Sequence, residues 1–542
     1  MQSREFFMAK RRRPTPIGNR RARDRPVPMI DAPSRRLQAA LSLWNEGRHA
    51  DALDLYREAI RQEPNNVRTY VQAARAHAER YDFDGLSRAH EKLVRRAPRH
   101  PGVHHYIGET FDLLKLPERA MASYECAAQL PGAGPVTWME LASLYERAHR
   151  LDEAEELIER TVRSGSNLPI VSLVRGRIQR RQKRLEQAEA TFQALIGQLP
   201  EDSEWACQAW SELALMKDRE GDFVGASDAI DRCKRVQKAH EAPFWSASEK
   251  VHEQMRELIA AVTRDDFRSW REATGHLTEE RIALLSGFPR SGTTLLEQVL
   301  DAHPDLVSSE ERDFIGRELF CEITAHRKKM PLIDVLNELR VDQIGAERQR
   351  YFRAMEYLLG EPLRGRMHMD KNPAYNLTIP LMLRLFPETR LIIALRDPRD
   401  VVLSCYLRYL PLNAVSVRFL DVERTASRYA LDMTAWLKFR ELVEVPWCEV
   451  RYEDTVTNLE SQARRALATL GLPWDDQVLN YRQRLTSEKQ VTSPSYEAVA
   501  EPIYTRAIGR WKNYERLLEP ALKTLDPFIR EYLLARAAGK IV

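Results

Sequence analysis

Residues 284–300 read LLSGFPRSGTTLLEQVL. An apolar run of strand type leads into a turn bounded by Gly287 and Gly292, and an amphipathic helical pattern follows directly. The two glycines permit a tight turn, so that successive backbone amides point together at the start of a helix, where partial positive charge collects. The stretch therefore predicts a phosphate-binding turn between a strand and a helix.

The composition of this turn separates two kinds of phosphate site. Its spacing is G-x-x-x-x-G, but Thr293 stands where an NTP-hydrolysing P-loop has its lysine, and Arg290 is the cation inside the turn. The glycines alone would also fit an ordinary strand-to-helix turn. The full run P-R-S-G-T-T, however, closely resembles the loop with which sulfotransferases hold the 5′-phosphosulfate of 3′-phosphoadenosine 5′-phosphosulfate (PAPS). The resemblance implies that the donor is bound by Arg290, Ser291, Gly292, Thr293 and Thr294.

The chain from Arg281 onward alternates strand-length apolar runs with helical patterns. The runs lie at 282–288, 366–370, 390–397 and 447–454. Such alternation predicts a mostly parallel sheet with helices on both faces, and ligands bind such sheets at the carboxyl ends of the strands. We expect a three-layer, P-loop-like α/β domain over residues 281–535.

A second polar cluster, RDPRDVVLSCYLR, begins at Arg396. Arg396 ends a strand, and Ser404 and Arg408 are expected one turn apart on the following helix, because a spacing of four puts side chains on one face. All three could hold one phosphate. In sulfotransferases the strand-end arginine and the serine eight residues later grip the 3′-phosphate of PAPS, and Arg396 and Ser404 match that spacing. A surface salt-bridge network is the alternative for Arg399 and Asp400.

Two further positions resemble catalytic residues of the tyrosylprotein sulfotransferase branch. The resemblance implies that Glu311, the second glutamate of a pair, is the general base. It also implies that Lys371, in the run DKNP, stabilises the leaving group together with Arg290. The branch reads E-E-T-R where this chain reads E-E-R-D, so an arginine is displaced and an acid is added. Without the resemblance, Glu311 would be read as an exposed carboxylate at a helix start and Lys371 as a surface lysine.

Three weaker matches to the same branch lie in the C-terminal part of the chain. The resemblance places Ser495 near the transferring group, in a loop that closes over the nucleotide. It places Arg510, the residue before Trp511, and Tyr452, in VRYED, beside the nucleotide. The branch needs no metal, because positioned donors can stabilise the charge that develops during sulfuryl transfer.

The N-terminal half repeats itself with a period of 34 residues. One small or apolar position recurs at Ala52, Leu86, Ala120, Ala154 and Ala188, and at Ala226 after a four-residue insertion. The pattern resembles tetratricopeptide (TPR) repeats, which stack helix pairs into an α-solenoid. We expect about six repeats over residues 37–240 and a helical connector over 241–280. Two readings stay open: the array binds a protein or peptide partner, or it only supports the second half.

Charge and cysteine content limit the other possibilities. Residues 1–36 hold eleven Lys and Arg against three acids, a charge of +8, which leaves −4 for residues 37–542. The basic tail is expected to be disordered, and the acidic remainder argues against nucleic acid. Six scattered cysteines without a C-x-x-C pair predict reduced thiols, with no zinc site and no disulfide framework. No apolar run suits a signal or a membrane span, so the cytoplasm is expected.

Taken with the resemblance, these features lead to one main hypothesis. The chain is expected to be a PAPS-dependent sulfotransferase with TPR repeats in front, an architecture known in bacterial proteins. Its acceptor would be a tyrosine hydroxyl of a protein or peptide, or else a carbohydrate or small-molecule hydroxyl, and its product 3′,5′-ADP. The alternatives are a phosphotransferase that uses ATP and a catalytically inactive TPR scaffold.

Overall fold

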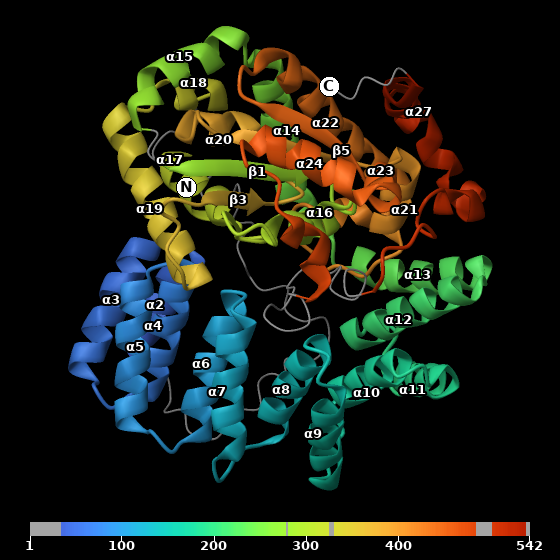
Figure 1. Ribbon diagram of the computed structural model, residues 1–542. Helices are drawn as coiled ribbons and strands as arrows, with labels where there is room; N and C mark the ends of the chain where they lie inside the picture. The colour runs from blue at the N-terminus through green and yellow to red at the C-terminus, as the bar shows by residue number, and fades with distance from the viewer. Residues whose placement is uncertain (1–33, 278–279, 325–329, 484–500, 538–542) are drawn as a thin grey trace. The chain divides into compact units, whose positions relative to one another are not determined.

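The computed structural model describes residues 34–277, 280–324, 330–483 and 501–537 (Figure 1). The chain divides into two compact units, one ending at His240 and the other beginning at Glu241. The tail before Ser34 and the predicted site residue Ser495 lie outside the described residues.

The first unit consists of consecutive helix pairs, as the repeat pattern predicts. Its first helix begins at Arg35 and is capped by the hydroxyl of Ser34, which accepts from the Leu37 amide, so the array starts two residues before the expected boundary. The helices of the six pairs are α2 Arg35–Asn45 and α3 His49–Gln62, α4 Val67–Glu79 and α5 Phe83–Arg96, α6 Pro101–Leu113 and α7 Pro117–Gln129, α8 Pro135–Arg147 and α9 Leu151–Arg163, α10 Pro169–Arg181 and α11 Leu185–Gly197, and α12 Glu204–Glu220 and α13 Phe223–Lys238.

The recurring small position is the point of closest packing. All six residues at that phase, from Ala52 to Ala226, are 0% exposed. The facing helix is equally constrained, because a Cβ added at Gly176 would lie 2.4 Å from the ring of Phe192, and one added at Gly108 would lie 2.7 Å from the ring of Tyr124. Small side chains on one helix therefore admit the aromatic rings of the next, which explains the sequence period.

The turn inside each pair passes through one residue with positive φ. These residues are Gly47, Tyr81, Lys115, His149, Lys183 and Gly221, with φ between 52° and 86°. Four of the six are not glycine, so their left-handed conformation is held by the packing of the helices on either side.

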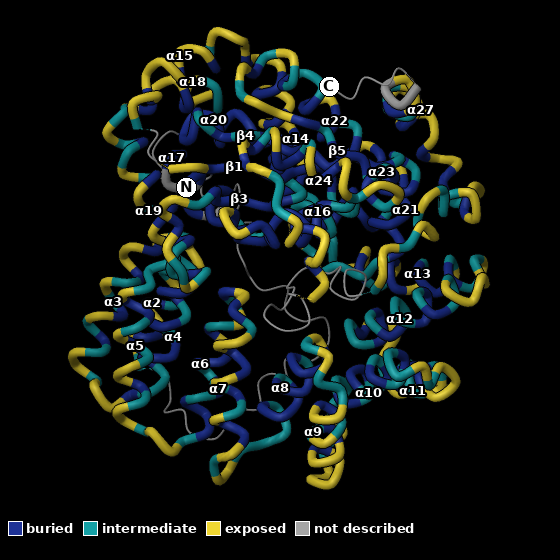
Figure 2. Tube along the Cα trace, viewed as in Figure 1, coloured by how far each residue is buried: buried dark blue, intermediate teal, exposed yellow. Residues whose placement is uncertain are grey.

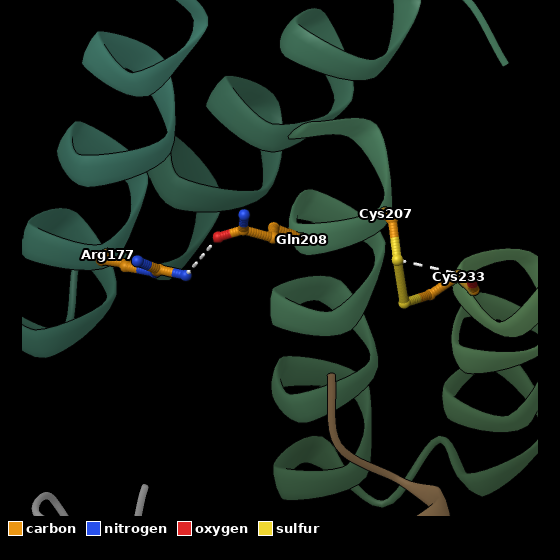
Figure 3. Close-up of a disulfide and its surroundings, with 4 residues drawn as sticks. All are labelled: Arg177, Cys207, Gln208 and Cys233. Carbon is orange, nitrogen blue, oxygen red and sulfur yellow. Dashed lines mark hydrogen bonds between the residues drawn. A yellow bond between two sulfur atoms is a disulfide. The ribbon is translucent and has the colours of Figure 1, made fainter. Parts of the chain in front are cut away.

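One disulfide corrects the prediction of reduced thiols. Cys207 of α12 is bonded to Cys233 of α13 (Figure 3), with a Cα–Cα distance of 4.3 Å. Helix pairing brings together two cysteines that are 26 residues apart, a proximity that local spacing does not reveal. Disulfides are rare in a reducing cytoplasm, so the compartment remains a prediction. Among the described cysteines, Cys126, Cys405 and Cys448 are not disulfide-bonded.

The expected connector is helical and belongs to the second unit. It forms α14 Ala242–Ala261 and α15 Arg264–Thr274. Trp245 of α14 lies 4.0 Å from the guanidinium of Arg418 and 4.4 Å from that of Arg424. Arg418 also donates to Ser248 of α14 over 2.9 Å. The segment is thus fastened to the sheet-bearing unit by stacked arginines.

The second unit contains a five-stranded sheet in the order β2-β3-β1-β4-β5. Figure 1 labels β1, β3 and β5 of this sheet. Its strands are β1 Arg281–Gly287, β2 Leu306–Ser308, β3 Met367–Lys371, β4 Arg390–Leu395 and β5 Trp447–Arg451. All four pairings are parallel, which confirms the predicted parallel sheet. The sequence pattern missed β2, because a strand of three residues gives too short an apolar run to recognise.

The strands are buried on both faces, as a parallel sheet requires (Figure 2). Alternate residues such as Ala283 and Leu285 join the cluster formed with Leu296 of α16 (Thr293–Asp301) and Leu467 of α24 (Leu459–Leu470). On the opposite face, Trp436 of α22 (Val422–Leu442) donates to Glu449 of β5 over 2.8 Å.

Helices surround this sheet and set the positions of its loops. They are α16 Thr293–Asp301, α17 Phe320–Thr324, α18 Leu332–Asn337, α19 Val341–Leu359, α20 Ile379–Leu385, α21 Pro398–Tyr406, α22 Val422–Leu442, α23 Tyr452–Thr457, α24 Leu459–Leu470 and α27 Glu515–Ala537. The short turns are η2 Gly275–Leu277, η3 Ile315–Leu319, η4 Asn376–Thr378, η5 Ser416–Leu420, η6 Asp476–Asn480 and η7 Arg510–Tyr514, of which η3 is π-helical. Among the residues described, no helix has the length and apolar character that crossing a membrane requires.

Candidate active site

The predicted phosphate-binding turn joins β1 to α16. Gly287 has a φ of +147°, and a Cβ there would lie 2.4 Å from the carbonyl oxygen of Ala394 in β4. Gly292 has a φ of +98°, and a Cβ there would lie 2.7 Å from the ring of Tyr452. Both glycines are required, since backbone or an aromatic ring occupies the space that a side chain would need.

Two polar atoms beside this turn are buried without a hydrogen-bond partner within the described part of the chain. They are the Oγ of Ser291 and the Nε of Arg396, and their residues are 2% and 7% exposed. Buried polar atoms are normally paired, so unpaired donors at the start of a helix are suited to an anionic ligand. Thr293 and Thr294 open α16 at the same point and are also buried. This donor set fits the phosphosulfate that the turn is expected to hold.

The predicted nucleotide residues on β1 and β4 converge. Arg290 donates from Nε to Ser404 Oγ over 3.2 Å, and Arg396 donates from Nη1 to the Arg290 carbonyl over 3.2 Å. The guanidinium of Arg396 lies 4.8 Å from the ring centre of Tyr452. Burial, and then Arg408 and Arg396, lower the pKa of Arg290 to about 10. The site thus concentrates positive charge where anionic groups would bind.

One predicted residue, Arg408, lies differently from expectation. Helix α21 ends at Tyr406, so Arg408 lies beyond the helix instead of one turn along from Ser404, although it still acts on Arg290. Arg510 lies in η7, where its guanidinium is 5.9 Å from the ring centre of Tyr514.

Asp400 fixes the C-terminal segment, a role that the sequence did not reveal. It is 1% exposed and accepts from the amides of Gly509 and Trp511, each over 2.8 Å. The alternative of a surface salt-bridge network does not hold for Asp400, which is buried; Arg399 pairs instead with Asp397 over 2.7 Å and stacks on Trp511 at 3.7 Å. A separation of more than one hundred residues hides this contact from local spacing.

Lys371 and Glu311 lie in contact near the carboxyl end of β3. Lys371 ends β3, opposite Leu285 of β1, and its Nζ lies 2.9 Å from Glu311 Oε1. A second carboxylate, Glu297 of α16, lies 3.1 Å from the same Nζ. The side chains of Lys371 and Glu297 are 0% exposed, whereas that of Glu311 is 23% exposed. The interpretation of Lys371 as a surface lysine is wrong.

The electrostatics of this cluster keep the ammonium charged. Burial alone would lower the pKa of Lys371. The negative charges of Glu297, Glu311 and Glu310, in decreasing order of effect, raise it by more than burial lowers it, so the pKa lies above its usual value. Glu310 is 4% exposed with a φ of 54°, a left-handed conformation that turns the chain and leaves Glu311 toward solvent.

A buried polar layer lies behind Lys371. Asp370 accepts from the Tyr351 hydroxyl over 2.7 Å, and Tyr375 donates to Asp313 over 2.7 Å. Burial raises the pKa of Asp370 to about 7, against the lowering effect of the Tyr351 hydrogen bond. The described residues contain no group of three or more His, Cys, Asp or Glu arranged to hold a metal ion.

Comparison with known proteins assigns the family of each part. Residues 283–476 match the sulfotransferase family, and residues 37–85 and 139–203 match the tetratricopeptide repeat. The protein-tyrosine sulfotransferase A of Caenorhabditis elegans is 25% identical over 283 residues, 49% of this chain and 72% of the relative. The protein-tyrosine sulfotransferase 1 of Danio rerio is 27% identical over 248 residues, 42% of this chain and 65% of the relative.

The chain thus spans between 65% and 72% of the length of these two relatives. Among solved structures, the sulfotransferase domain of the Synechococcus PCC 7002 olefin synthase is 21% identical, covers 46% of this chain and 96% of that domain, and has a TM-score of 0.30. The matched residues 283–476 contain the phosphate-binding turn, Glu311, Lys371, Arg396 and Ser404. The chain therefore carries a domain of the sulfotransferase family, preceded by tetratricopeptide repeats.

Proposed function

We propose that the second unit transfers a sulfuryl group from PAPS to an acceptor hydroxyl. One observation carries the proposal: the donors of the β1–α16 turn converge with Arg290, Arg396 and Ser404 at the carboxyl ends of β1 and β4. The unpaired donors of Ser291 and Arg396 support it, because an anion would complete their hydrogen bonding.

The residues divide into two groups by the part of the donor that they would bind. Ser291, Thr293 and Thr294, with the amides of the turn, suit the 5′-phosphosulfate. Arg396 and Ser404, with Arg408 nearby, suit a 3′-phosphate, while Tyr452 and Arg510 are proposed to border the nucleotide. PAPS supplies an activated sulfuryl group, whose bond to the phosphate oxygen breaks as the bond to the acceptor oxygen forms.

The acid–base work is assigned to the Glu311–Lys371 pair. Glu311 is the member that solvent reaches, so its carboxylate is proposed to take the proton of the acceptor hydroxyl. Lys371 and Arg290 are proposed to stabilise the negative charge on the leaving phosphate oxygen. Ser495 keeps its proposed place near the transferring group. Because Glu311 and Lys371 are 2.9 Å apart, Glu311 has to loosen its hold on the ammonium when an acceptor arrives.

The acceptor is proposed to be a tyrosine of a protein or peptide. The named protein-tyrosine sulfotransferases among the relatives support this choice. Arg312 and Asp313, which depart from the pattern of that branch, lie beside Glu311, and Asp313 is bound by the Tyr375 hydroxyl. A carbohydrate or small-molecule hydroxyl is the competing acceptor, and the TPR array is proposed to bind a protein partner.

Nucleotide selectivity tests the donor. We expect calorimetric titration to show that 3′,5′-ADP binds at least tenfold more tightly than 5′-AMP or ATP. Tighter binding of ATP would favour the phosphotransferase, and no binding of any nucleotide would favour the inactive scaffold.

Product analysis tests the base and the acceptor. With labelled PAPS and a tyrosine peptide, mass spectrometry should detect transfer, and Glu311→Gln should reduce turnover by about 10²- to 10⁴-fold with little change in 3′,5′-ADP affinity. Glu310→Gln is the matched control and should cost far less. Near-normal turnover in Glu311→Gln would exclude Glu311 as the base. Transfer to a sugar or small hydroxyl but not to the peptide would replace the acceptor.

A further inference from the structure

Glu297 is a buried carboxylate that the proposed reaction does not yet use. It lies in the middle of α16, is 0% exposed, and places Oε2 3.1 Å from the ammonium of Lys371. Its other oxygen, Oε1, accepts from the hydroxyl of Ser308 over 2.5 Å. Each oxygen therefore has a defined contact, one to β2 and one to the lysine at the end of β3.

Packing alone does not explain an acid at this position. Helix α16 is already tied to β2 by Asp301, which accepts from the Ser308 amide over 2.6 Å. The neighbouring residues Leu296 and Leu300 belong to the apolar cluster against the sheet, where an uncharged side chain would suit Glu297 as well. A buried carboxylate is retained at a cost unless it is paired with a charge, and Lys371 is that charge.

A second carboxylate is needed beside Lys371 if the first one loses its negative charge during the reaction. When Glu311 takes a proton it becomes neutral, and without another acid the buried ammonium of Lys371 would lose its compensation. Glu297 has no contact with solvent and stays in place during that step. It also lies one helical turn after Thr293, so the helix that opens at the phosphate-binding turn is the same one that holds the lysine.

We propose that Glu297 is a positioning residue, which holds Lys371 charged and directed at the leaving group while Glu311 exchanges a proton with the acceptor. The inference rests on the proposed sulfuryl transfer and adds a division of labour between two carboxylates. Glu297 fixes the charge of the lysine, and Glu311 performs the proton transfer.

The ionisable groups facing Lys371 set the expected pH dependence. They are Glu297 from α16, Glu311 and Glu310 from the segment after β2, and Asp370, which precedes Lys371 in β3. The charge of Asp313 in turn raises the pKa of Asp370. Glu297 contributes the largest charge effect on the lysine. Its removal should lower the pKa of Lys371, so that the lysine loses its proton at a lower pH than in the unaltered protein.

Three variants separate this role from a structural one. Glu297→Gln keeps the shape and the contact with Ser308 but removes the charge, Glu297→Asp keeps the charge on a shorter side chain, and Ser308→Ala keeps the Glu297 charge but removes its support. We expect Glu297→Gln to reduce turnover ten- to a hundredfold and to shift the alkaline limb of the pH–rate profile at least one pH unit lower. Glu297→Asp and Ser308→Ala should retain the alkaline limb of the unaltered protein.

A second readout does not depend on activity. NMR of the nucleotide-free protein with ¹³C-labelled lysine follows the Cε signal of Lys371 and reports the pH at which this buried side chain, which is 0% exposed, loses its proton. We expect that pH to fall in Glu297→Gln and to stay unchanged in Ser308→Ala. Failure of the proposed function would appear separately, as absence of 3′,5′-ADP binding by the unaltered protein. An unshifted Lys371 titration in Glu297→Gln, or equal losses of turnover in Glu297→Gln and Ser308→Ala, would overturn the positioning role.

Discussion

Asp400 should control whether the C-terminal segment stays closed against the nucleotide site. Its two oxygens accept from Gly509 and Trp511, each over 2.8 Å, and Arg396 of the site donates to the Ala507 carbonyl of the same segment over 2.6 Å. Replacing Asp400 by Ala removes both amide acceptors from a residue that is 1% exposed.

The size of the effect follows from the number of bonds and the cost of burial. A hydrogen bond to a charged group contributes about 1.5 to 3 kcal/mol, so the two bonds bound the loss at about 3 to 6 kcal/mol. Burial, which raises the pKa of Asp400, offsets part of this, because the ionised carboxylate has left water. We therefore expect Asp400→Ala to reduce the free energy of opening the segment by about 2.7 kcal/mol, a hundredfold in the opening equilibrium.

Hydrogen exchange of the segment measures this directly. The amides of Gly509 and Trp511 should exchange about a hundredfold faster in Asp400→Ala, and about tenfold faster in Asp400→Asn, which keeps one acceptor oxygen. The affinity for 3′,5′-ADP should fall with the same rank order, because Arg396 loses its tie to the segment. Unchanged exchange at both amides in Asp400→Ala would refute the reasoning, whatever the effect on activity.

Three further predictions concern other parts of the chain. Arg396→Ala should weaken 3′,5′-ADP binding at least tenfold and barely change 5′-AMP binding in the same titration. Lys183→Gly should raise the unfolding free energy by up to about 1 kcal/mol by relieving a φ of 63°. Gly221→Ala at the equivalent turn should lower it by about 1 kcal/mol, because a φ of 86° disfavours any Cβ; the added Cβ would meet nothing within 4 Å, so no clash increases this cost. The pKa of Asp370 is raised to about 7 in the folded protein, so its contribution to stability is complete below the pKa of the unfolded chain and is lost as the pH rises to 7. Asp370→Asn should therefore remove about 2 to 3 kcal/mol of the difference in stability between pH 5 and pH 8, as measured by denaturant titration.

The sequence predicted that Arg290, Arg396 and Ser404 lie together, because contiguous motifs carry them, while their role in binding the donor stays a prediction. The run from Pro289 to Thr294 encodes the turn, and the eight-residue step from Arg396 to Ser404 encodes a strand end and the face of the next helix. Residues a few positions apart on one strand end or one helix have fixed relative positions, so their spacing in the sequence predicts these contacts. The 34-residue period fixed the helix pairs for the same reason, as the burial of every residue at that phase confirms.

The missed residues are those whose partners lie far away in the chain. Glu297 meets Lys371 only because β1 and β3 are neighbours in the sheet, and Asp400 meets Gly509 across 109 residues. Cys207 and Cys233 belong to the same class, because helix pairing alone joins them. A signal for Glu297 did exist: an acid stands among leucines and valine on a helix expected to pack on the sheet, and a buried acid needs a partner.

The order of the strands separates charge across the site. From β1 the chain reaches β2 and β3 on one side and then β4 and β5 on the other, so the sheet reverses direction at β1, where ligands of such folds bind. Arg396 follows β4, and Arg408 follows the next helix on the same side of the sheet. Glu310 and Glu311 follow β2 on the other side. Lys371, at the end of β3, lies between the two. An anionic donor is thus drawn to one side of β1, and a hydroxyl that must lose a proton faces carboxylates on the other, so the sheet topology itself gives the proposed transfer its direction.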